Sequence, residues 1–520
     1  VVVKETLKLG GEEIGEFSER FAIRGRIGSD TPPPAVANAG GNAEDTIDTP
    51  RSVLRRARVT APSDMTPFAN VSGDFNPIHT SARAAVVAGL EAPLVHGMWL
   101  SAVAQNLVEA VGPDGEGWVV TGWTYNMYGL VNLEDTVDLQ VERIGRLPGG
   151  GQVLEVTCKI DGQVVSRATA TTAAPRTAYL YPGQGIQRQG MGLDEMATSE
   201  AARDVWERAD RVTRKGLGFS IIAVVRDNPQ ELISGDNVWR HPDGILNLTQ
   251  FTQVALATVA FAQTARLRET GALVEGAYFA GHSLGEYTAL SSYGNVFPLE
   301  NVLEIVFHRG STMHNLVERD ELGRSNYRMG AIRPNQLGVD DAGIVAYVDS
   351  VAEKSGEFLQ IVNFNLADQQ YAVAGTIAGL RALELDANER AEAHGGKRAF
   401  MYVPGIDVPF HSRVLRKGVP EFREKLLRLI PAEVDTDRLV GKYIPNLVAQ
   451  PFELTREFAQ AIVDEVPSEP ISELLADDAK WNKALEDPNH LSRLLLVELL
   501  CWQFASPVRW IETQQLLFTP

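Results

Sequence analysis

The sequence predicts a multidomain chain of mixed α/β and α+β class, in which a helix wrapped by an antiparallel sheet precedes an α/β unit. Apolar residues spaced three and four apart predict a helix over residues 97–111. Alternating residues separated by Gly- and Asp-rich turns then predict four strands, at residues 118–128, 136–144, 152–160 and 164–171. After residue 175 the order becomes strand, Gly-rich turn, helix, which is typical of α/β folds.

Length and charge narrow the class of protein. The chain has 520 residues, with 48 Lys and Arg against 67 Asp and Glu, a net charge of −19 and a pI near 5.0. At about 100–200 residues per domain, we expect three or four structural units. A chain this acidic repels nucleic acid and anionic membrane, so an anionic substrate must be met by a few locally placed cations.

Cysteine content and hydropathy predict a soluble, cytoplasmic protein. Cys158 and Cys501 are too few for a disulfide framework or a thiolate metal site, and we expect no metal. The most apolar helical stretch, residues 494–502, is far shorter than the roughly 20 residues of a membrane span and carries Glu498.

Changes in composition predict the domain boundaries. Residues 1–28 alternate like strands but are too few to close a sheet, and the chain begins Val-Val-Val without Met, so we expect a piece of a longer protein. Residues 29–50 are rich in Pro, Gly and acidic residues and predict a flexible linker. We expect one domain at 51–175 and a second at 176–520, with a small inserted α+β unit at about 335–405.

A serine motif stands where the α/β pattern favours a nucleophile. Residues 281–285 read Gly-His-Ser-Leu-Gly, between an apolar strand and a helix. The two glycines permit a strained turn that exposes the hydroxyl of Ser283, and the helix N-terminus supplies an N–H and a positive dipole for an oxyanion. A tight turn with a capping serine explains the bare pattern equally well, so further motifs are needed.

Those motifs are Pro-Gly-Gln-Gly at residues 182–185, His-Arg-Gly at 308–310 and Val-Pro-Phe-His-Ser at 408–412. With them, residues 177–520 resemble the malonyl/acyl transferases of fatty-acid and polyketide synthases, which have an α/β-hydrolase-like core with a ferredoxin-like insertion.

The transferase resemblance implies a role for each matching residue. Ser283 attacks a thioester carbonyl, and His411 takes its proton and later returns it to the leaving thiolate. The backbone N–H groups of Gln184 and Leu284 form the oxyanion hole, and Arg309 clamps a free malonyl carboxylate.

Phe410 and His282, which adjoin His411 and Ser283, are assigned no part in the proton transfer. Phe410 resembles the malonyl-selecting form of the family, in which the ring leaves no room for a 2-methyl group. His282 is assigned to structure, because its side chain points away from the pocket if Ser283 is exposed.

A second constellation lies in the first domain, where residues 73–79 read Gly-Asp-Phe-Asn-Pro-Ile-His and residues 93–98 open the predicted helix. Dehydration of a 3-hydroxyacyl thioester needs an acid, a base and donors for an enolate-like oxygen. An Asx turn followed by loop histidines is the ordinary alternative. The string resembles the MaoC-like, hydratase-2 type of hot-dog domain over about residues 51–172, which implies that Asp74 and His79 are catalytic.

The motif leaves acid and base unassigned; we favour His79 as the base for the α-proton, with Asp74 handling the hydroxyl or water. The N–H of Gly97 approaches the thioester carbonyl, since no side chain stands in the way, and His96 is assigned mostly to structure.

The order of the two domains resembles that of fungal and actinobacterial type I fatty-acid synthases, in which residues 1–28 would end a preceding hot-dog unit. The resemblance implies dehydration of 3-hydroxyacyl groups and transfer of malonyl, with palmitoyl as a second acyl group, between CoA and an acyl carrier protein. It implies CoA and phosphopantetheine thioesters as substrates, no cofactor bound by these domains, and an oligomer with enoyl reductase, ketoreductase and ketosynthase domains. A thioester hydrolase using Ser283 and His411, and a silent docking scaffold, are the alternatives.

Overall fold

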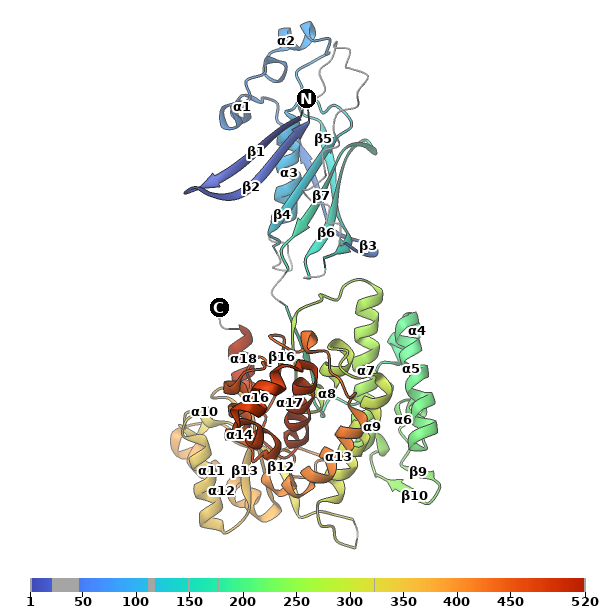
Figure 1. Ribbon diagram of the computed structural model, residues 1–520, viewed down its shortest axis with the longest axis vertical. Coiled ribbons are helices and arrows are strands. Elements are labelled where there is room, and N and C mark those ends of the chain that lie inside the picture. Colours follow the sequence, from blue (N-terminus) through green and yellow to red (C-terminus); the bar gives the residue numbers. More distant parts are fainter. Residues whose placement is uncertain are drawn as a thin grey trace. The chain divides into compact units, whose positions relative to one another are not determined.

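The computed structural model describes residues 2–20, 46–110, 117–147, 150–174, 177–321 and 323–518. The chain divides into two compact units, Val1–Pro175 and Arg176–Pro520 (Figure 1). Among the described residues, no helix combines the length and apolar character that crossing a bilayer requires.

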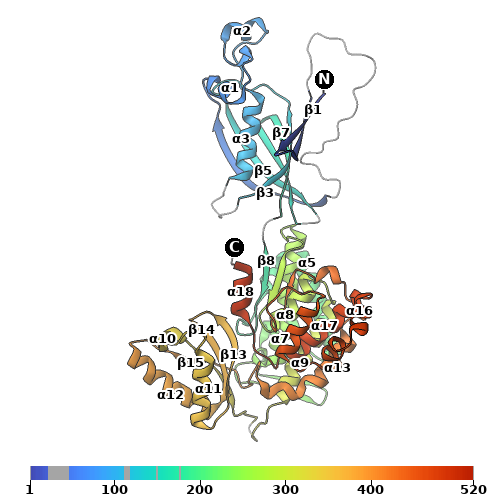
Figure 2. The ribbon, with the colours of Figure 1, turned by 60° about the vertical axis from the view of Figure 1, so that its left-hand side comes forward.

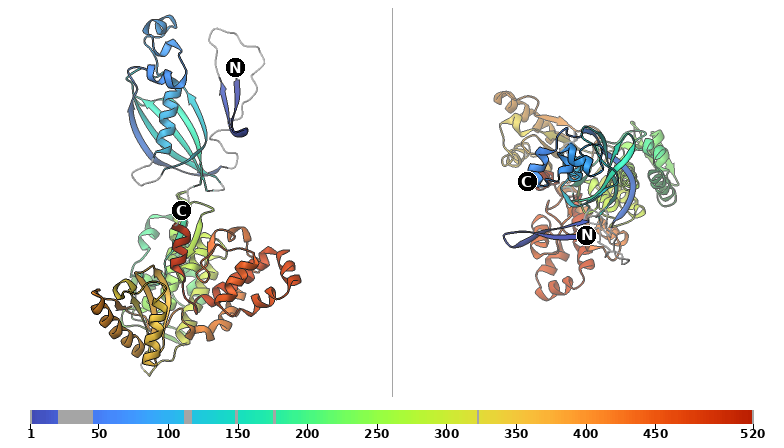
Figure 3. Two further views of the ribbon diagram at one scale, coloured as in Figure 1. Left: turned by 90° about the vertical axis from the view of Figure 1, so that its left-hand side faces the viewer. Right: turned by 90° about the horizontal axis from the view of Figure 1, so that it is seen from above.

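The first unit contains a five-stranded antiparallel sheet in the order β3-β5-β6-β7-β4. A long helix lies along one face of this sheet (Figure 3). Alternate residues of the strands, such as Val137, Leu139 and Val141, face this helix and form the core with its Leu100 and Ala104. The elements are β3 (Ile47–Thr60), α1 (Thr66–Ser72), η1 (Pro77–His79), α2 (Ala82–Val87), α3 (Gly97–Glu109), β4 (Val120–Met127), β5 (Thr136–Arg146), β6 (Gln152–Ile160) and β7 (Gln163–Thr172).

The N-terminal strands form a hairpin of their own, β1 (Val2–Leu9) paired with β2 (Glu12–Arg20). Residues 21–28 and most of the expected linker lie outside the described residues. The linker prediction is wrong at its end, because β3 already begins at Ile47. Pro50 lies within β3, and a proline in the sequence argues against a strand. Pro50 sits at a pairing irregularity between Asp48 and Ser52 on an edge strand, where no ladder N–H is required.

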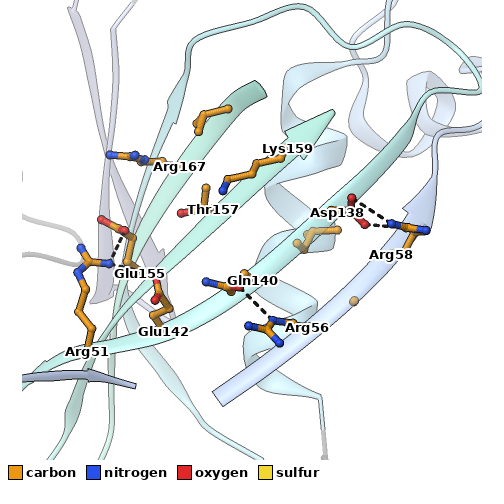
Figure 4. Close-up of a pocket in the computed structure, with 13 residues that line it drawn as sticks. Arg51, Arg56, Arg58, Asp138, Gln140, Glu142, Glu155, Thr157, Lys159 and Arg167 are labelled. Carbon is orange, nitrogen blue, oxygen red and sulfur yellow. Dashed lines mark hydrogen bonds and ion pairs between the residues drawn. The ribbon is translucent and has the colours of Figure 1, made fainter. Parts of the chain in front are cut away.

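The outer face of the sheet, opposite α3, is polar. It forms a groove of about 500 Å³ (Figure 4). Its exposed ion pairs and hydrogen bonds join Arg58 to Asp138, Arg56 to Gln140, and Arg51 to both Glu142 and Glu155. Exposed pairs of this kind contribute little to stability. The alternation along residues 136–142 of β5 and along β6 thus places apolar side chains inward and charged ones outward, whereas Arg143 and Arg146 at the end of β5 are buried.

The second unit is built on a three-stranded parallel sheet in the order β16-β11-β8, enclosed by helices. Helix α7 is buried over most of its length and packs beside α9, while α17 is buried from Leu495 to its end at Gln503. The strands are β8 (Ala178–Tyr181), β11 (Tyr278–Gly281) and β16 (Tyr443–Ile444), with a separate hairpin of β9 (Glu231–Ser234) and β10 (Asn237–Arg240). The helices are α4 (Leu193–Thr198), α5 (Glu200–Val212), α6 (Ile221–Asp227), α7 (Thr249–Glu269), α8 (Leu284–Thr288), α9 (Leu299–Asn315), α13 (Val419–Leu429), α14 (Arg456–Glu465), α15 (Glu469–Leu475), α16 (Asp478–Leu485), α17 (Pro488–Gln503) and α18 (Trp510–Phe518).

The inserted unit has the order βαββαβ of a ferredoxin-like fold, with an antiparallel sheet β13-β14-β12-β15 against which α11 and α12 pack (Figure 2). Its elements are β12 (Tyr327–Ile332), α10 (Pro334–Leu337), α11 (Ile344–Ser355), β13 (Leu359–Leu366), β14 (Gln370–Thr376), α12 (Ile377–His394) and β15 (Phe400–Tyr402).

The insertion begins before residue 335, so the predicted range of about 335–405 is too short at its start. The missed strand β12 contains Gly330, which weakens the strand signal. The glycine is required because a Cβ there would lie 2.2 Å from the ring of Phe400.

Candidate active sites

A sharp turn between β11 and α8 presents Ser283. Its backbone is left-handed, with φ 54° and ψ −112°, which is strained for a residue with a side chain. The turn depends on both flanking glycines. A Cβ at Gly281 would lie 1.9 Å from the backbone of Gly285, and a Cβ at Gly285 would lie 2.0 Å from the carbonyl of Tyr181. This strand–turn–helix geometry is that of a nucleophile elbow.

His411 reaches Ser283 from the loop after the inserted unit. Its Nε2 lies 2.6 Å from the Ser283 Oγ, and its Nδ1 lies 2.9 Å from the carbonyl oxygen of Gln503 and 3.2 Å from that of Ser506. Both carbonyls accept, so Nδ1 carries the proton and Nε2 offers a lone pair to the serine. Burial, with the cation of Arg309 as a second cause, lowers the pKa of His411 to about 3. Two backbone carbonyls therefore orient a neutral base, which the sequence did not reveal.

Arg309 points from α9 to the same serine. It is 1% exposed, and its guanidinium donates to the Ser283 Oγ at 3.2 Å, the Gln503 Oε1 at 2.8 Å and the Gln253 Oε1 at 3.0 Å. Within the described residues no carboxylate forms an ion pair with it, and its Nε is buried without an acceptor. A cation held by neutral amides beside a nucleophile is suited to an anionic group that arrives with the substrate.

The two expected oxyanion donors, the N–H groups of Leu284 and Gln184, lie next to the turn that carries Ser283. Leu284 is the first residue of α8, so its N–H lies in the unsatisfied first turn. Gln184 follows Gly183, at which a Cβ would lie 3.6 Å from that of Ser283. The side chain of Gln184 accepts from Thr249 at 2.8 Å, which fixes its loop against α7.

Phe410 and His282 occupy the junction between the core and the inserted unit. Phe410 is half-buried and packs against apolar residues of the inserted sheet, among them Met329 and Val362. His282 bonds Asn365 through its Nε2 at 2.9 Å and lines a cavity of about 500 Å³ next to Gly183. His282 therefore has a structural contact, as expected, but its side chain also borders an open space.

Four buried polar residues complete the serine site without having been assigned a role from the sequence: Gln253, Glu286, Asn446 and Gln503. Asn446 accepts from the Ser283 N–H at 2.7 Å and donates to the Gly281 carbonyl at 2.5 Å, which holds the elbow. Gln503 ends the mostly apolar stretch 494–503 of α17, and a polar residue at the end of such a stretch is the sequence signal for such a group.

The first unit brings Asp74 and His79 together. Asp74 lies in the loop after α1, and its Oδ1 accepts from the N–H of Asn76 at 3.1 Å. His79 ends a short 3-10 helix, and its Nδ1 donates to the carbonyl of Leu94 at 2.8 Å, so its Nε2 carries a lone pair. Burial, followed in importance by neighbouring His96, lowers the pKa of His79. His79 is thus held as a neutral base beside a half-exposed carboxylate.

His96 and Gly97 form the rim of this site. His96 is 2% exposed, stacks on His79 with 3.9 Å between ring centroids, and its Nε2 donates to the backbone carbonyl of Asp74 at 3.0 Å. One ligand-type atom from each of Asp74, His79 and His96 lies within 4.8 Å of the others. Gly97 is the first residue of α3, and a Cβ there would lie 2.2 Å from the Sδ of Met127. The absence of a side chain thus keeps the helix N-terminus close to Met127.

Comparison with known proteins identifies both domains. Residues 42–163 match the model of the MaoC like domain, and residues 178–378 match that of the acyl transferase domain. The chain is 34% identical to the fatty acid synthase subunit beta of Saccharomyces cerevisiae over 508 residues, which covers 81% of this chain and 25% of that protein. It is 33% identical to the fatty acid synthase 2 of Mycosarcoma maydis, with 98% of this chain and 16% of that protein covered.

Solved structures with similar folds include FabD from Acinetobacter baumannii, at 23% identity and a TM-score of 0.48, with 66% of this chain and 84% of that chain covered. An acyl carrier protein S-malonyltransferase from Vibrio cholerae has 24% identity and a TM-score of 0.47, with coverage of 66% and 86%. The chain spans about a quarter of the length of its yeast relative. With a MaoC-like domain followed by an acyl transferase domain, the chain belongs to the fungal-type fatty acid synthase family.

Proposed function

We propose that the chain carries two activities of fatty acid synthesis: transfer of malonyl, and of palmitoyl, between CoA and an acyl carrier protein, and dehydration of a (3R)-3-hydroxyacyl thioester to a trans-2-enoyl thioester. One observation carries the transferase proposal. The nucleophile–base pair Ser283–His411 contacts Arg309, a buried cation with no carboxylate partner among the described residues. A hydrolase acting on neutral acyl chains has no use for that cation.

In the transferase step, the Ser283 Oγ attacks the thioester carbonyl while the His411 Nε2, 2.6 Å away, takes the hydroxyl proton. The N–H groups of Gln184 and Leu284 stabilise the oxyanion. The C–S bond then breaks and His411 returns the proton to the CoA thiolate. The carrier thiol reverses these steps, so that the Oγ–C bond breaks and a new thioester forms. Arg309 binds the malonyl carboxylate throughout, and Phe410 restricts the space at C2.

In the dehydratase step, the His79 Nε2 removes the α-proton, the Cα=Cβ double bond forms, and the β-hydroxyl takes a proton from Asp74 and departs as water. The Nδ1–H bond of His79 to Leu94 supports this assignment, because it leaves only Nε2 free to accept a proton. The helix N-terminus at Gly97 faces the enolate-like oxygen. The net reaction breaks Cα–H and Cβ–O and releases one water.

The proposed partners follow from these substrates. CoA and phosphopantetheine thioesters bind without a further cofactor, and an acyl carrier protein delivers the chains. Enoyl reductase, ketoreductase and ketosynthase domains, in an oligomeric assembly in the cytoplasm, complete the cycle; the kinship with fatty acid synthases supports this proposal.

Mass spectrometry of the intact chain after brief exposure to malonyl-CoA tests the transferase. We expect a malonyl adduct on Ser283 and none on Ser283→Ala. A correctly folded wild-type chain that never acquires label would instead identify the domain as a scaffold.

The dehydratase is tested in the reverse direction, by hydration of a trans-2-enoyl thioester. The loss of ultraviolet absorbance of the enoyl thioester measures the rate. His79→Ala and Asp74→Asn are each expected to lower the rate by about 10²-fold or more, the magnitude of a lost general acid or base. Arg167→Ala, on the exposed face of β7, is the control and should retain the wild-type rate. Wild-type rates in both active-site variants would refute the assignment.

A further inference from the structure

We infer that Glu286 and Gln503 form a hydrogen-bond relay that holds Arg309 in the orientation that binds an acyl carboxylate, so that Glu286 is a specificity-determining positioning residue. This inference rests on the proposed transferase function. Glu286 lies three residues after the nucleophile, in the first turn of α8, and is 1% exposed. A glutamate at this position of a helix often bonds back to the N-cap N–H, but the N–H of Ser283 is bound by Asn446 instead. The Glu286 carboxylate is therefore free to turn inward.

The side-chain amide of Gln503 connects the carboxylate to the guanidinium. Its Nε2 donates to the Glu286 Oε2 at 2.8 Å and to the Ser283 carbonyl at 2.5 Å. Both partners accept only, so the amide must present its oxygen on the other side, where Arg309 donates at 2.8 Å. Glu286 and the Ser283 carbonyl together fix which end of the Gln503 amide faces Arg309.

The other oxygen of Glu286 anchors the relay. Oε1 accepts from the Asn446 N–H at 3.1 Å and from the Tyr443 hydroxyl. Burial raises the pKa of Glu286 to about 7. The hydrogen bonds from Tyr443, Asn446 and Gln503 act against this shift and favour the ionised carboxylate. A donor therefore faces each oxygen of the Glu286 carboxylate.

The Gln503 amide, which stands between the charges of Glu286 and Arg309, favours a substrate that carries a carboxylate. A carboxylate in direct contact would form an ion pair with Arg309 and compete with the carboxylate of malonyl. Gln503 on one side and Gln253 on the other hold the guanidinium through neutral oxygens, which leaves its positive charge for the substrate. The amide of Gln253 is oriented in the same way, because its Nε2 donates to the Gln184 and Thr249 oxygens.

The test compares two labelling rates of Ser283 in the full chain: one with malonyl-CoA and one with a fluorophosphonate, which reacts with an activated serine and carries no carboxylate. Glu286→Gln keeps the volume but places an NH₂ group against a donor. Gln503→Met removes the acceptor of Arg309 and keeps the backbone carbonyl that orients His411. Each is expected to lower the ratio of malonyl to fluorophosphonate rates by about tenfold, and the double variant should lower it no further, because both act through one path.

Tyr443→Phe is the matched control, since it removes a donor to Oε1 and leaves the Gln503 arm intact; its ratio should stay within about twofold of wild type. The relay would be overturned if Glu286→Gln or Gln503→Met lost both labelling rates equally, or if their effects added in the double variant. It would also be overturned if Tyr443→Phe lowered the ratio as much as Glu286→Gln does. If Glu286→Gln fails to fold, Glu286→Asp replaces it, because the shorter side chain keeps the charge but withdraws the carboxylate from the Gln503 Nε2. Failure of wild type to react with either reagent would instead refute the proposed function.

Discussion

Arg309 constrains the substrate more than any other side chain in the second unit, because its charge is buried beside the nucleophile without a carboxylate partner among the described residues. Burial lowers the pKa of the guanidinium, yet an arginine stays protonated in proteins. The negative charge that pairs with Arg309 is therefore expected to come from a carboxylate of the substrate.

Arg309→Lys tests this view, because an ammonium cannot form the bidentate pair with a carboxylate. We expect kcat/KM for malonyl transfer to fall about 10- to 150-fold, which corresponds to loss of about 1.5–3 kcal/mol for a hydrogen bond to a charged group. Labelling of Ser283 by a fluorophosphonate is the control and should change little. Equal loss in both assays would show that Arg309 supports the serine and not the substrate.

The low pKa of His411 predicts how the rate of Ser283 acylation depends on pH. Its pKa of about 3 keeps it neutral far below the ordinary histidine range, so the acid limb of Ser283 acylation should lie well below pH 6. His411 should therefore contribute no change in rate between pH 5 and pH 8. A limb near pH 7 that disappears in Glu286→Gln would belong to Glu286, whose pKa is about 7. A limb near pH 6.5 that persists in that variant would contradict the account, because it would mean that His411 titrates as if exposed.

The elbow between β11 and α8 shows how closely packed backbone determines the site. Gly285→Ala would place a methyl group 2.0 Å from the carbonyl of Tyr181 in β8, where backbone and not a flexible side chain must move. We expect a loss of stability of about 1–3 kcal/mol, typical of overpacking, and a labelling rate of Ser283 at least tenfold lower. Thermal unfolding and adduct formation measure the two effects.

Gly216→Ala provides the control for that substitution, because the added methyl group meets no atom within 4 Å. Its effect on stability should stay within about 0.5 kcal/mol. An unchanged melting temperature in Gly285→Ala, with wild-type labelling, would mean that the elbow tolerates displacement of α8.

Sequence patterns predicted those elements whose own residues carry the signal. The amphipathic helix at Gly97 and the strands β5 and β6 have clear periodicity, and the glycine-flanked turn at Ser283 has a recognisable motif. The start of β3 and the strand β12 were missed, because Pro50 and Gly330 are tolerated only through partners distant in the chain.

The same reasoning separates the predicted from the unpredicted parts of the site. Ser283, His411 and Arg309 were singled out by motifs, and the structure brings their side chains within hydrogen-bonding distance. The carbonyls that orient His411 and the amide of Gln503 come from the end of α17 and the residues just after it, about 90 residues further along the chain. No local pattern records such a contact. The catalytic roles themselves stay predictions.

The molecule consists of two units with separate hydrophobic cores, one around α3 and one around α7 and α17. Each candidate site lies within one unit. Ser283→Ala is therefore expected to leave the hydration of an enoyl thioester unchanged, and His79→Ala should leave the malonyl adduct unchanged. Assay of both activities on each variant measures this independence. A loss of more than about twofold in the other activity would show that the sites are coupled.

The fate of the acyl-enzyme tests transfer most directly. Wild-type chain loaded with malonyl on Ser283 is freed of excess malonyl-CoA, mixed with holo acyl carrier protein, and followed by mass spectrometry of both proteins. We expect the adduct to leave Ser283 as malonyl-carrier appears in equal amount, and to persist when the carrier is omitted. Release of free malonate at the same rate with and without carrier would contradict transfer and identify the second unit as a thioester hydrolase.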